Sequence, residues 1–279
     1  MKTRAITGAI FVAIVLASLM LGTYIFTAFV LALSLLMLNE FYQLVTKATT
    51  IRPQRIGGLV LAISVHLPLI SIYLSLRQYL FRNDPVKNLF LCVPIIAIII
   101  ISELYRKQQN PFHNIAYTLF GVLFVSVPCC FFYALAFMDG VYNMHYPLAF
   151  LLLLWSNDVG AYLVGSTLGK RKLFEYHSPN KSWEGFLGGM FSSILVSLII
   201  SIYFKEFMWI HWLTIALIIT IAGTFGDLIE SMLKRSLSIK DSGSILPGHG
   251  GLLDRFDGLL LAAPLVLIYL QVMAALHWL

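Results

Sequence analysis

The sequence predicts an all-α polytopic membrane protein, with about nine transmembrane helices and a polar site at the cytoplasmic ends of the C-terminal helices. Of the 279 residues, 59% are hydrophobic and only 11% are Asp, Glu, Lys or Arg. Soluble domains carry about 25% charged residues, so this composition excludes an ordinary soluble fold. Apolar runs of about 20 residues, the length that crosses a bilayer, recur along the whole chain. Because lipid offers no hydrogen bonds to the backbone, each run is expected to be helical.

Nine apolar segments are predicted to cross the membrane. They lack the short alternating pattern of a membrane β-barrel. No linker separates them, so a single integral membrane domain is predicted over 1–279, with N-terminal spans in 1–145 and the spans and loops of the candidate site in 146–279. The predicted spans are 5–22, 24–39, 57–76, 88–102, 115–138, 146–166, 185–204, 208–226 and 258–278.

Basic residues are concentrated in the segments that share a side with the N-terminus. Fifteen of the 19 Lys and Arg residues lie there. The positive-inside rule therefore places the N-terminus, and the polar segments 167–184 and 227–257, in the cytoplasm, as expected for a protein of the cell (inner) membrane. This bias explains most of the net charge of +6, so no nucleic-acid ligand is expected. The remaining basic residues are Arg77, Arg82, Lys87 and Lys205.

The three cysteines, Cys92, Cys129 and Cys130, all lie inside apolar spans. None forms a Cys-x-x-Cys pair. They are therefore expected to be buried thiols and neither metal ligands nor a disulfide framework.

A first polar segment, "WSNDVGAYLVGS", interrupts the predicted span 146–166 at Asn157 and Asp158. A carboxylate at the centre of a membrane helix costs about 2.5–3.5 kcal/mol on insertion scales. Either these two side chains meet a partner or a wet cavity, or they cap a helix end at the membrane surface. The sequence leaves both interpretations open.

A second polar segment, "SPNKSWEG", occupies residues 178–185. Ser178 with Pro179 predicts a turn, and Ser182 is a suitable N-cap for a following helix that contains Glu184. Free backbone N–H groups at a helix start, beside Lys181, suit an anionic phosphate.

Small residues recur every fourth position in the helix that follows, at Gly185, Gly189 and Ser193. This spacing is typical of close helix packing in membranes.

The third polar segment, "GDLIESMLKRSLSIKDSGSILPGHGGLLDRFDG", lies between the last two spans. If a helix continues through 227–235, one face carries two acids, a hydroxyl and a base. These residues are Asp227, Glu230, Ser231 and Lys234.

Glycines follow in the same segment, at Gly243, Gly248, Gly250 and Gly251. They allow backbone N–H groups to converge on an anion.

Two further acids, Asp254 and Asp257, then open the last helix at i and i+3. Acids at two helix ends, joined by an amide-rich basic loop, suit a divalent cation together with phosphates. Hard oxygen ligands with a lone histidine and no local cysteine indicate Mg²⁺ and not zinc. Costly charges beside bilayer-length helices also mark functional sites.

The third segment resembles the signature of phosphatidate cytidylyltransferases, also called CDP-diacylglycerol synthases. "NDVGAY" and "SPNKSWEG" are similar to two further blocks of that family, in the same order. Two positions depart from the common pattern: Ser238, where many members have Gly, and Asn180, where many have Lys. The signature residues are Ser231, Lys234, Arg235, Lys240, Asp241, Gly243, His249, Gly250, Gly251, Asp254, Arg255 and Asp257.

The resemblance implies that CTP and phosphatidate react at a lipid bilayer to give CDP-diacylglycerol and pyrophosphate. It implies Mg²⁺, with room for a second cation, on Asp227 and Asp254, with Asp257 completing the shell. The implied catalytic residues are Asp227, Lys234, Arg235, Lys240, Asp241, His249, Asp254, Arg255 and Asp257. The implied substrate contacts are Asn157, Asp158, Ser178, Lys181, Glu184, Ser231, Gly250 and Gly251. The role of His249, as a phosphate donor or as part of a turn, and the oligomeric state, a homodimer included, stay open.

Two alternatives are weaker. "DRFDG" also opens the motif of CDP-alcohol phosphotransferases, but that motif continues with further aspartates, and no acid follows Asp257 here. An ion-coupled transporter would carry matching broken helices in its two halves. Here the candidate residues are confined to 155–258.

Overall fold

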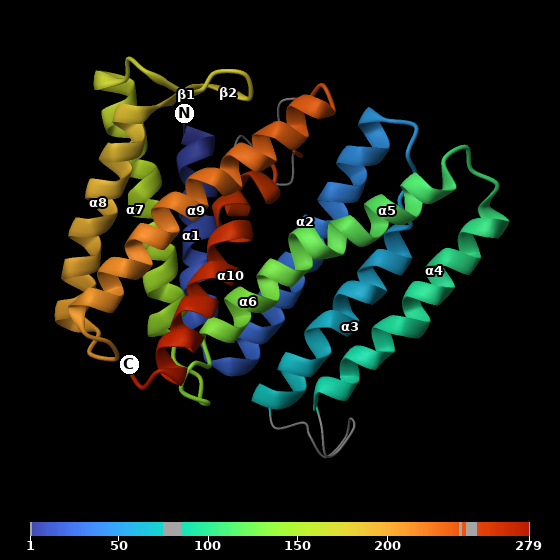
Figure 1. Ribbon diagram of the computed structural model, residues 1–279, viewed down its shortest axis with the longest axis horizontal. Helices are drawn as coiled ribbons and strands as arrows, with labels where there is room; N and C mark the ends of the chain where they lie inside the picture. The colour runs from blue at the N-terminus through green and yellow to red at the C-terminus, as the bar shows by residue number, and fades with distance from the viewer. Residues whose placement is uncertain (1, 75–84, 240–241, 244–249, 279) are drawn as a thin grey trace. The chain divides into compact units, whose positions relative to one another are not determined.

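The computed structural model describes residues 2–74, 85–239, 242–243 and 250–278, and helices dominate them (Figure 1). Within this described part, eight helical segments are long and apolar enough to cross a membrane, and Ile6–Met20 is a shorter apolar helix. The prediction of an all-α polytopic membrane protein is confirmed. The helices are α1 (Lys2–Met20), α2 (Thr23–Ala48), α3 (Arg55–Tyr73), α4 (Cys92–Arg106), α5 (Pro111–Gly121), α6 (Val127–Leu135), α7 (His145–Leu168), α8 (Trp183–Tyr203), α9 (Trp209–Ser236) and α10 (Leu253–Ala275).

Two of the membrane-length segments are composite. A 3₁₀ turn, Pro85–Leu91, precedes α4. A π-helical segment, Val122–Ser126, joins α5 to α6 without a break, so Pro111–Leu135 forms one segment long and apolar enough to cross a membrane. The sequence predicted each as a single span, since hydropathy does not distinguish a 3₁₀ or π segment from an α-helix.

The chain divides into two compact units. The first contains Met1–Asn143 and Leu237–Arg255, and the second contains Met144–Ser236 and Phe256–Leu279. The segment Leu237–Arg255 belongs to the first unit although it follows most of the second in sequence.

Aromatic side chains from α2 and α6 form much of the core of the first unit. Phe26 lies 6.0 Å from Phe132 and 5.9 Å from Tyr133, measured between ring centroids. Helix α1 packs on α2, and α3 and α4 run side by side (Figure 1).

Helix α2 is longer than its sequence predicted. The expected span 24–39 stopped where the polar pair Asn39-Glu40 begins, but the helix continues to Ala48. Apolar burial resumes immediately at Phe41. The side chain of Glu40 is itself only 3% exposed and accepts hydrogen bonds. A hydropathy average counts this carboxylate as polar, because it contains no information on the hydrogen bonds that the side chain accepts.

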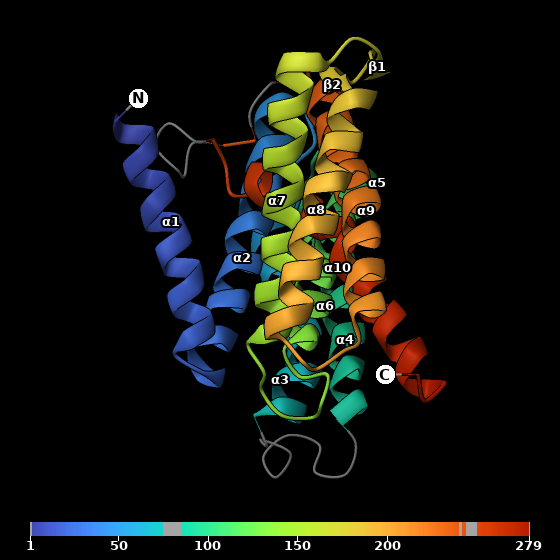
Figure 2. The ribbon, with the colours of Figure 1, turned by 90° about the vertical axis from the view of Figure 1, so that its left-hand side faces the viewer.

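In the second unit, α7, α8 and α9 lie side by side (Figure 2). The predicted small-residue stripe of α8 is in contact with α7. A Cβ atom at Gly189 would overlap Asn157, and Ser193 Oγ donates a hydrogen bond to the Leu153 carbonyl at 3.0 Å. The packing role predicted for this stripe is confirmed.

A short antiparallel hairpin joins α7 to α8, formed by β1 (Lys172–Phe174) and β2 (Ser178–Ser182). The turn covers residues 175–177, so the prediction that Ser178 and Pro179 begin a turn was wrong: strand pairing draws these two residues into β2. The predicted N-cap is confirmed, because Ser182 Oγ accepts a hydrogen bond from the Gly185 N–H at 3.1 Å.

Candidate functional site

Three carboxylates from α9 and α10 form a cluster in the second unit. One oxygen each of Asp227, Glu230 and Asp257 lies within 4.8 Å of the others. Glu230 is fully buried, whereas Asp227 and Asp257 are half-buried. At this spacing, each pair of charges repels by about 3 kcal/mol at the effective dielectric constant of a protein site. The arrangement therefore requires nearby positive charge.

Local sequence explains how the acids meet. Asp227 and Glu230 are one turn apart on α9, as the helical face predicted from the sequence requires. Gly226 lets α10 approach α9 closely, because a Cβ atom there would overlap the backbone of Asp257. A larger residue at Gly226 would therefore separate the two acid-bearing helices.

Two lysines stand beside the cluster. The Lys181 ammonium lies 2.5 Å from Asp227 Oδ2, and Lys234 forms an ion pair with Glu230 one turn away on α9. Ser231 donates a hydrogen bond to Asp227 Oδ1 at 3.3 Å. Lys181 and Ser231, predicted to contact substrate, thus meet Asp227, and Lys234, predicted to be catalytic, meets Glu230. With two ammonium groups against three carboxylates, one negative charge remains in excess if all five are ionised.

The cluster fits the cation predicted from the sequence. Its donors are all carboxylate oxygens, which are the ligands that Mg²⁺ prefers. Glu230 is the member that the sequence analysis did not place among the metal ligands. The available signal was its position three residues after Asp227, on the same helical face.

Asp254 is not a member of this group of three. Its Oδ2 accepts hydrogen bonds from the backbone N–H groups of Gly251 at 2.9 Å and Ser242 at 3.1 Å. A metal-binding role for Asp254 stays a prediction.

The glycines beside Asp254 have distinct roles. Gly250 adopts φ 83°, a left-handed conformation that favours glycine. The Gly251 N–H, predicted to face a phosphate, donates instead to Asp254. The backbone N–H groups of Ser242 and Gly251 thus bind a carboxylate of the protein itself.

On α7, Asn157 is buried and Asp158 is exposed. Asn157 Oδ1 has no hydrogen-bond partner in the described part of the chain. The charge of Asp158 acts on Asp257, as do those of Asp227 and Glu230. Helix α7 continues to Leu168, so these two residues do not cap a helix end. The negative charge of Asp158 adds to the repulsion at the acid cluster.

Glu184 binds the segment that leads into the hairpin. Its carboxylate accepts hydrogen bonds from the backbone N–H groups of Lys170 at 3.0 Å and Arg171 at 3.2 Å. Ser178 is half-buried at the start of β2. Their predicted substrate contacts stay predictions, and Glu184 has a clear structural role as well.

The remaining predicted site residues lie in or beside the loop between α9 and α10. Arg235 and Arg255 are exposed. Three predicted catalytic residues lie outside the described residues: Lys240, Asp241 and His249.

Similarity to known proteins extends over nearly the entire chain. The profile of the cytidylyltransferase family matches residues 2–273. A phosphatidate cytidylyltransferase of Staphylococcus aureus (strain COL) is 35% identical over 272 residues, covering 97% of this chain and 99% of that protein. A phosphatidate cytidylyltransferase of Bacillus subtilis (strain 168) is 32% identical over 267 residues, covering 95% of both chains. With three carboxylates and two lysines gathered from the second and third polar segments, and with these matches over nearly its full length, the chain belongs to the cytidylyltransferase family.

Proposed function

We propose that the protein transfers the cytidylyl group of CTP to phosphatidate, giving CDP-diacylglycerol and pyrophosphate. The observation that carries this proposal is the cluster of Asp227, Glu230 and Asp257, flanked by Lys181 and Lys234, at the ends of membrane-length helices. Such a site offers carboxylates for a cation and ammonium groups for phosphates. It lies on helices long and apolar enough to cross a membrane. The relatives named phosphatidate cytidylyltransferase support the same substrates.

In the proposed reaction, a phosphate oxygen of phosphatidate forms a bond to the α-phosphorus of CTP. The bond from that phosphorus to the bridging oxygen breaks, and pyrophosphate leaves with the electron pair. The attacking oxygen is already anionic near neutral pH, so a strong general base is unnecessary. Catalysis then depends on positioning and on neutralising charge.

The residues of the cluster divide this work. Asp227, Glu230 and Asp257 would hold Mg²⁺, which when bound neutralises charge on phosphate oxygens. Lys181 and Lys234 would exchange part of their contact with the acids for contact with phosphates. Ser231 orients Asp227 through its hydrogen bond.

The site is proposed to face the cytoplasm of a cell membrane. The concentration of Lys and Arg in the hairpin segment and in the α9–α10 segment supports this orientation. CTP would then reach the site from the cytoplasm, and the diacyl tails of phosphatidate would stay in the bilayer.

The direct test is turnover by the purified protein. Incubation with CTP, phosphatidate and Mg²⁺ is expected to release pyrophosphate and to form CDP-diacylglycerol in equal amounts. Omitting phosphatidate or adding a chelator should abolish both products. Turnover of CDP-diacylglycerol with a free alcohol, and none with CTP, would contradict the proposal.

A further inference from the structure

Glu40 is a buried acid far in sequence from every residue of the candidate site. It lies within α2, and its side chain is 3% exposed. An acid buried within a membrane-length helix is costly unless it is hydrogen-bonded, and such residues are usually functional. The partners of Glu40 therefore indicate what it does.

Three hydrogen bonds reach the Glu40 carboxylate from the two ends of the loop that connects α9 to α10. Ser242 Oγ donates to Oε1 at 2.6 Å. The backbone N–H groups of Leu252 and Leu253 donate to Oε2 at 2.8 and 3.3 Å. Glu40 thus joins the early part of the loop to its end, across more than 200 residues of sequence.

The position of this carboxylate also matters electrostatically. Leu253 is the first residue of α10. The first N–H groups of a helix lack partners within the helix and favour negative charge. The Glu40 carboxylate supplies an acceptor for the N–H groups at the start of α10.

Gly243 and Gly251 lack a side chain where the Glu40 carboxylate packs against them. A Cβ atom at Gly243 would overlap Glu40 Oε1, and a Cβ atom at Gly251 would overlap both Glu40 Oε1 and Ser242 Oγ. Two glycines of the signature are therefore explained by close approach to a carboxylate from α2. Asp254 completes the arrangement by accepting the N–H groups of Ser242 and Gly251.

We propose that Glu40 is a positioning residue for the reaction, holding Ser242 and the start of α10 in their working arrangement. It acts through Ser242, Leu252 and Leu253 and does not touch substrate. Since Asp254 follows Leu253 directly in the first turn of α10, a displaced helix start would displace it. This inference rests on the proposed function for its catalytic consequence, whereas the contact itself is testable without turnover.

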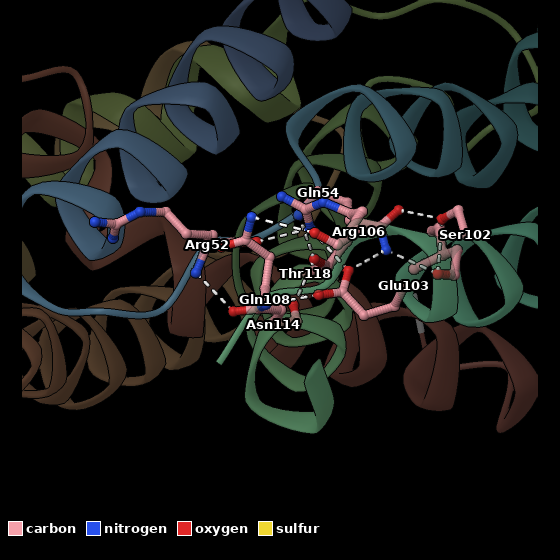
Figure 3. Close-up of polar contacts among 9 residues, drawn as sticks. Arg52, Gln54, Ser102, Glu103, Arg106, Gln108, Asn114 and Thr118 are labelled. Carbon is pink, nitrogen blue, oxygen red and sulfur yellow. Dashed lines mark hydrogen bonds and ion pairs between the residues drawn. The ribbon is translucent and has the colours of Figure 1, made fainter. Parts of the chain in front are cut away.

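A second buried acid of the same unit provides a matched control. Glu103, on α4, is also 3% exposed, and it accepts hydrogen bonds from Gln54, Arg106 and Asn114 (Figure 3). This network ties the segment between α2 and α3 to α4 and α5. These three bonds connect early segments of the chain to one another and not to the α9–α10 loop, so their loss should affect stability alone.

The experiment compares Glu40→Met, Glu40→Gln and Glu103→Met in full-length detergent-purified protein. Glu40→Met keeps side-chain length but removes every acceptor. It is expected to lower kcat at least tenfold and to accelerate amide hydrogen exchange in the segment 250–253. Glu40→Gln keeps one carbonyl acceptor and should give intermediate values for both. Glu103→Met should lower the melting temperature while kcat and exchange in that segment stay as in the wild type.

Ser242→Ala removes one of the three bonds and provides a test if Glu40→Met does not fold. Alone it should change kcat and exchange in the same direction as Glu40→Gln, but less. In the Glu40→Gln background it should add little, because both substitutions break the same link. Losses in kcat that multiply would contradict the proposal.

Two other outcomes would overturn it: wild-type kcat and exchange in Glu40→Met, or equal kcat losses in Glu40→Met and Glu103→Met. The first would show that the contact is dispensable, and the second that any buried acid of this unit matters equally. The wild-type protein could form no CDP-diacylglycerol while Glu40→Met still accelerates amide hydrogen exchange in the segment 250–253. In that case the proposed function would fail and the proposed contact would stand.

Discussion

The ammonium group of Lys181, on β2, lies 2.5 Å from a carboxylate oxygen of Asp227, on α9. This ion pair connects the hairpin between α7 and α8 with the acid cluster. Because Lys181 also donates to the Thr224 carbonyl at 3.4 Å, it is directed toward α9 by two contacts. Two polar segments that are separate in sequence therefore form one site within the second unit.

Lys181→Met should raise the KM for CTP about tenfold or more, since an ammonium–phosphate contact contributes about 1.5–3 kcal/mol. Lys172→Met, an exposed position on β1 of the same hairpin, is the control and should leave KM unchanged. Steady-state kinetics with varied CTP measures both. Equal KM values for the two variants would exclude a phosphate contact by Lys181.

Asp227→Asn and Asp257→Asn should each reduce turnover about a hundredfold or more, because each removes one charged ligand from a shared cation site. The double variant should lose little beyond the worse single variant. Mn²⁺ binding, followed by electron paramagnetic resonance, should weaken in the same three proteins. Asp139→Asn, an exposed position outside the cluster, should match the wild type. Losses that multiply in the double variant would separate the two acids into independent roles.

Glu230 and Lys234 form a buried ion pair, with side chains 0% and 14% exposed. Lys234→Met should destabilise the fold by about 3 kcal/mol or more, because it removes the charge opposite a buried carboxylate. Adding Glu230→Gln should restore most of the melting temperature but not the activity. Thermal unfolding in detergent, run beside turnover, tests this. If stability and activity returned together, Glu230 would be structural and not a cation ligand.

Ser238, two residues after the end of α9, adopts φ 56°. A left-handed conformation costs a non-glycine residue about 1–2 kcal/mol, while glycine loses about 0.4–1 kcal/mol through the entropy of the unfolded chain. Ser238→Gly should therefore stabilise the protein by up to about 1 kcal/mol, which raises Tm by roughly 2 °C. Ser238→Val should lower Tm instead. A lower Tm for the glycine variant would show that the backbone is not strained at this position.

Single cysteines test the proposed orientation in a background without Cys92, Cys129 and Cys130. Tyr176, at the hairpin turn, is 88% exposed, and Val141, between α6 and α7, is 67% exposed. The positive-inside bias predicts that a membrane-impermeant thiol reagent labels Val141→Cys in intact cells and labels Tyr176→Cys only after lysis. The reverse pattern would invert the topology.

The sequence by itself determined the membrane class, the approximate number of spans and the three polar segments. Runs of about 20 apolar residues admit few structures in lipid, since every backbone group must find its partner within the segment. Helical spacing likewise determined that Asp227, Glu230, Ser231 and Lys234 share one face. Ser182 as the N-cap of α8 followed from local chemistry alone.

Only the tertiary structure decided which polar groups meet. Nothing in the sequence pairs Glu40 with Ser242, or Lys181 with Asp227, because hydropathy and spacing describe one segment at a time. The same limit explains why α2 was predicted to end at residue 39: the cost of burying Glu40 is offset by hydrogen bonds from a loop more than 200 residues away. Long-range partners change the energetics of a buried charge, and packing alone determines those partners.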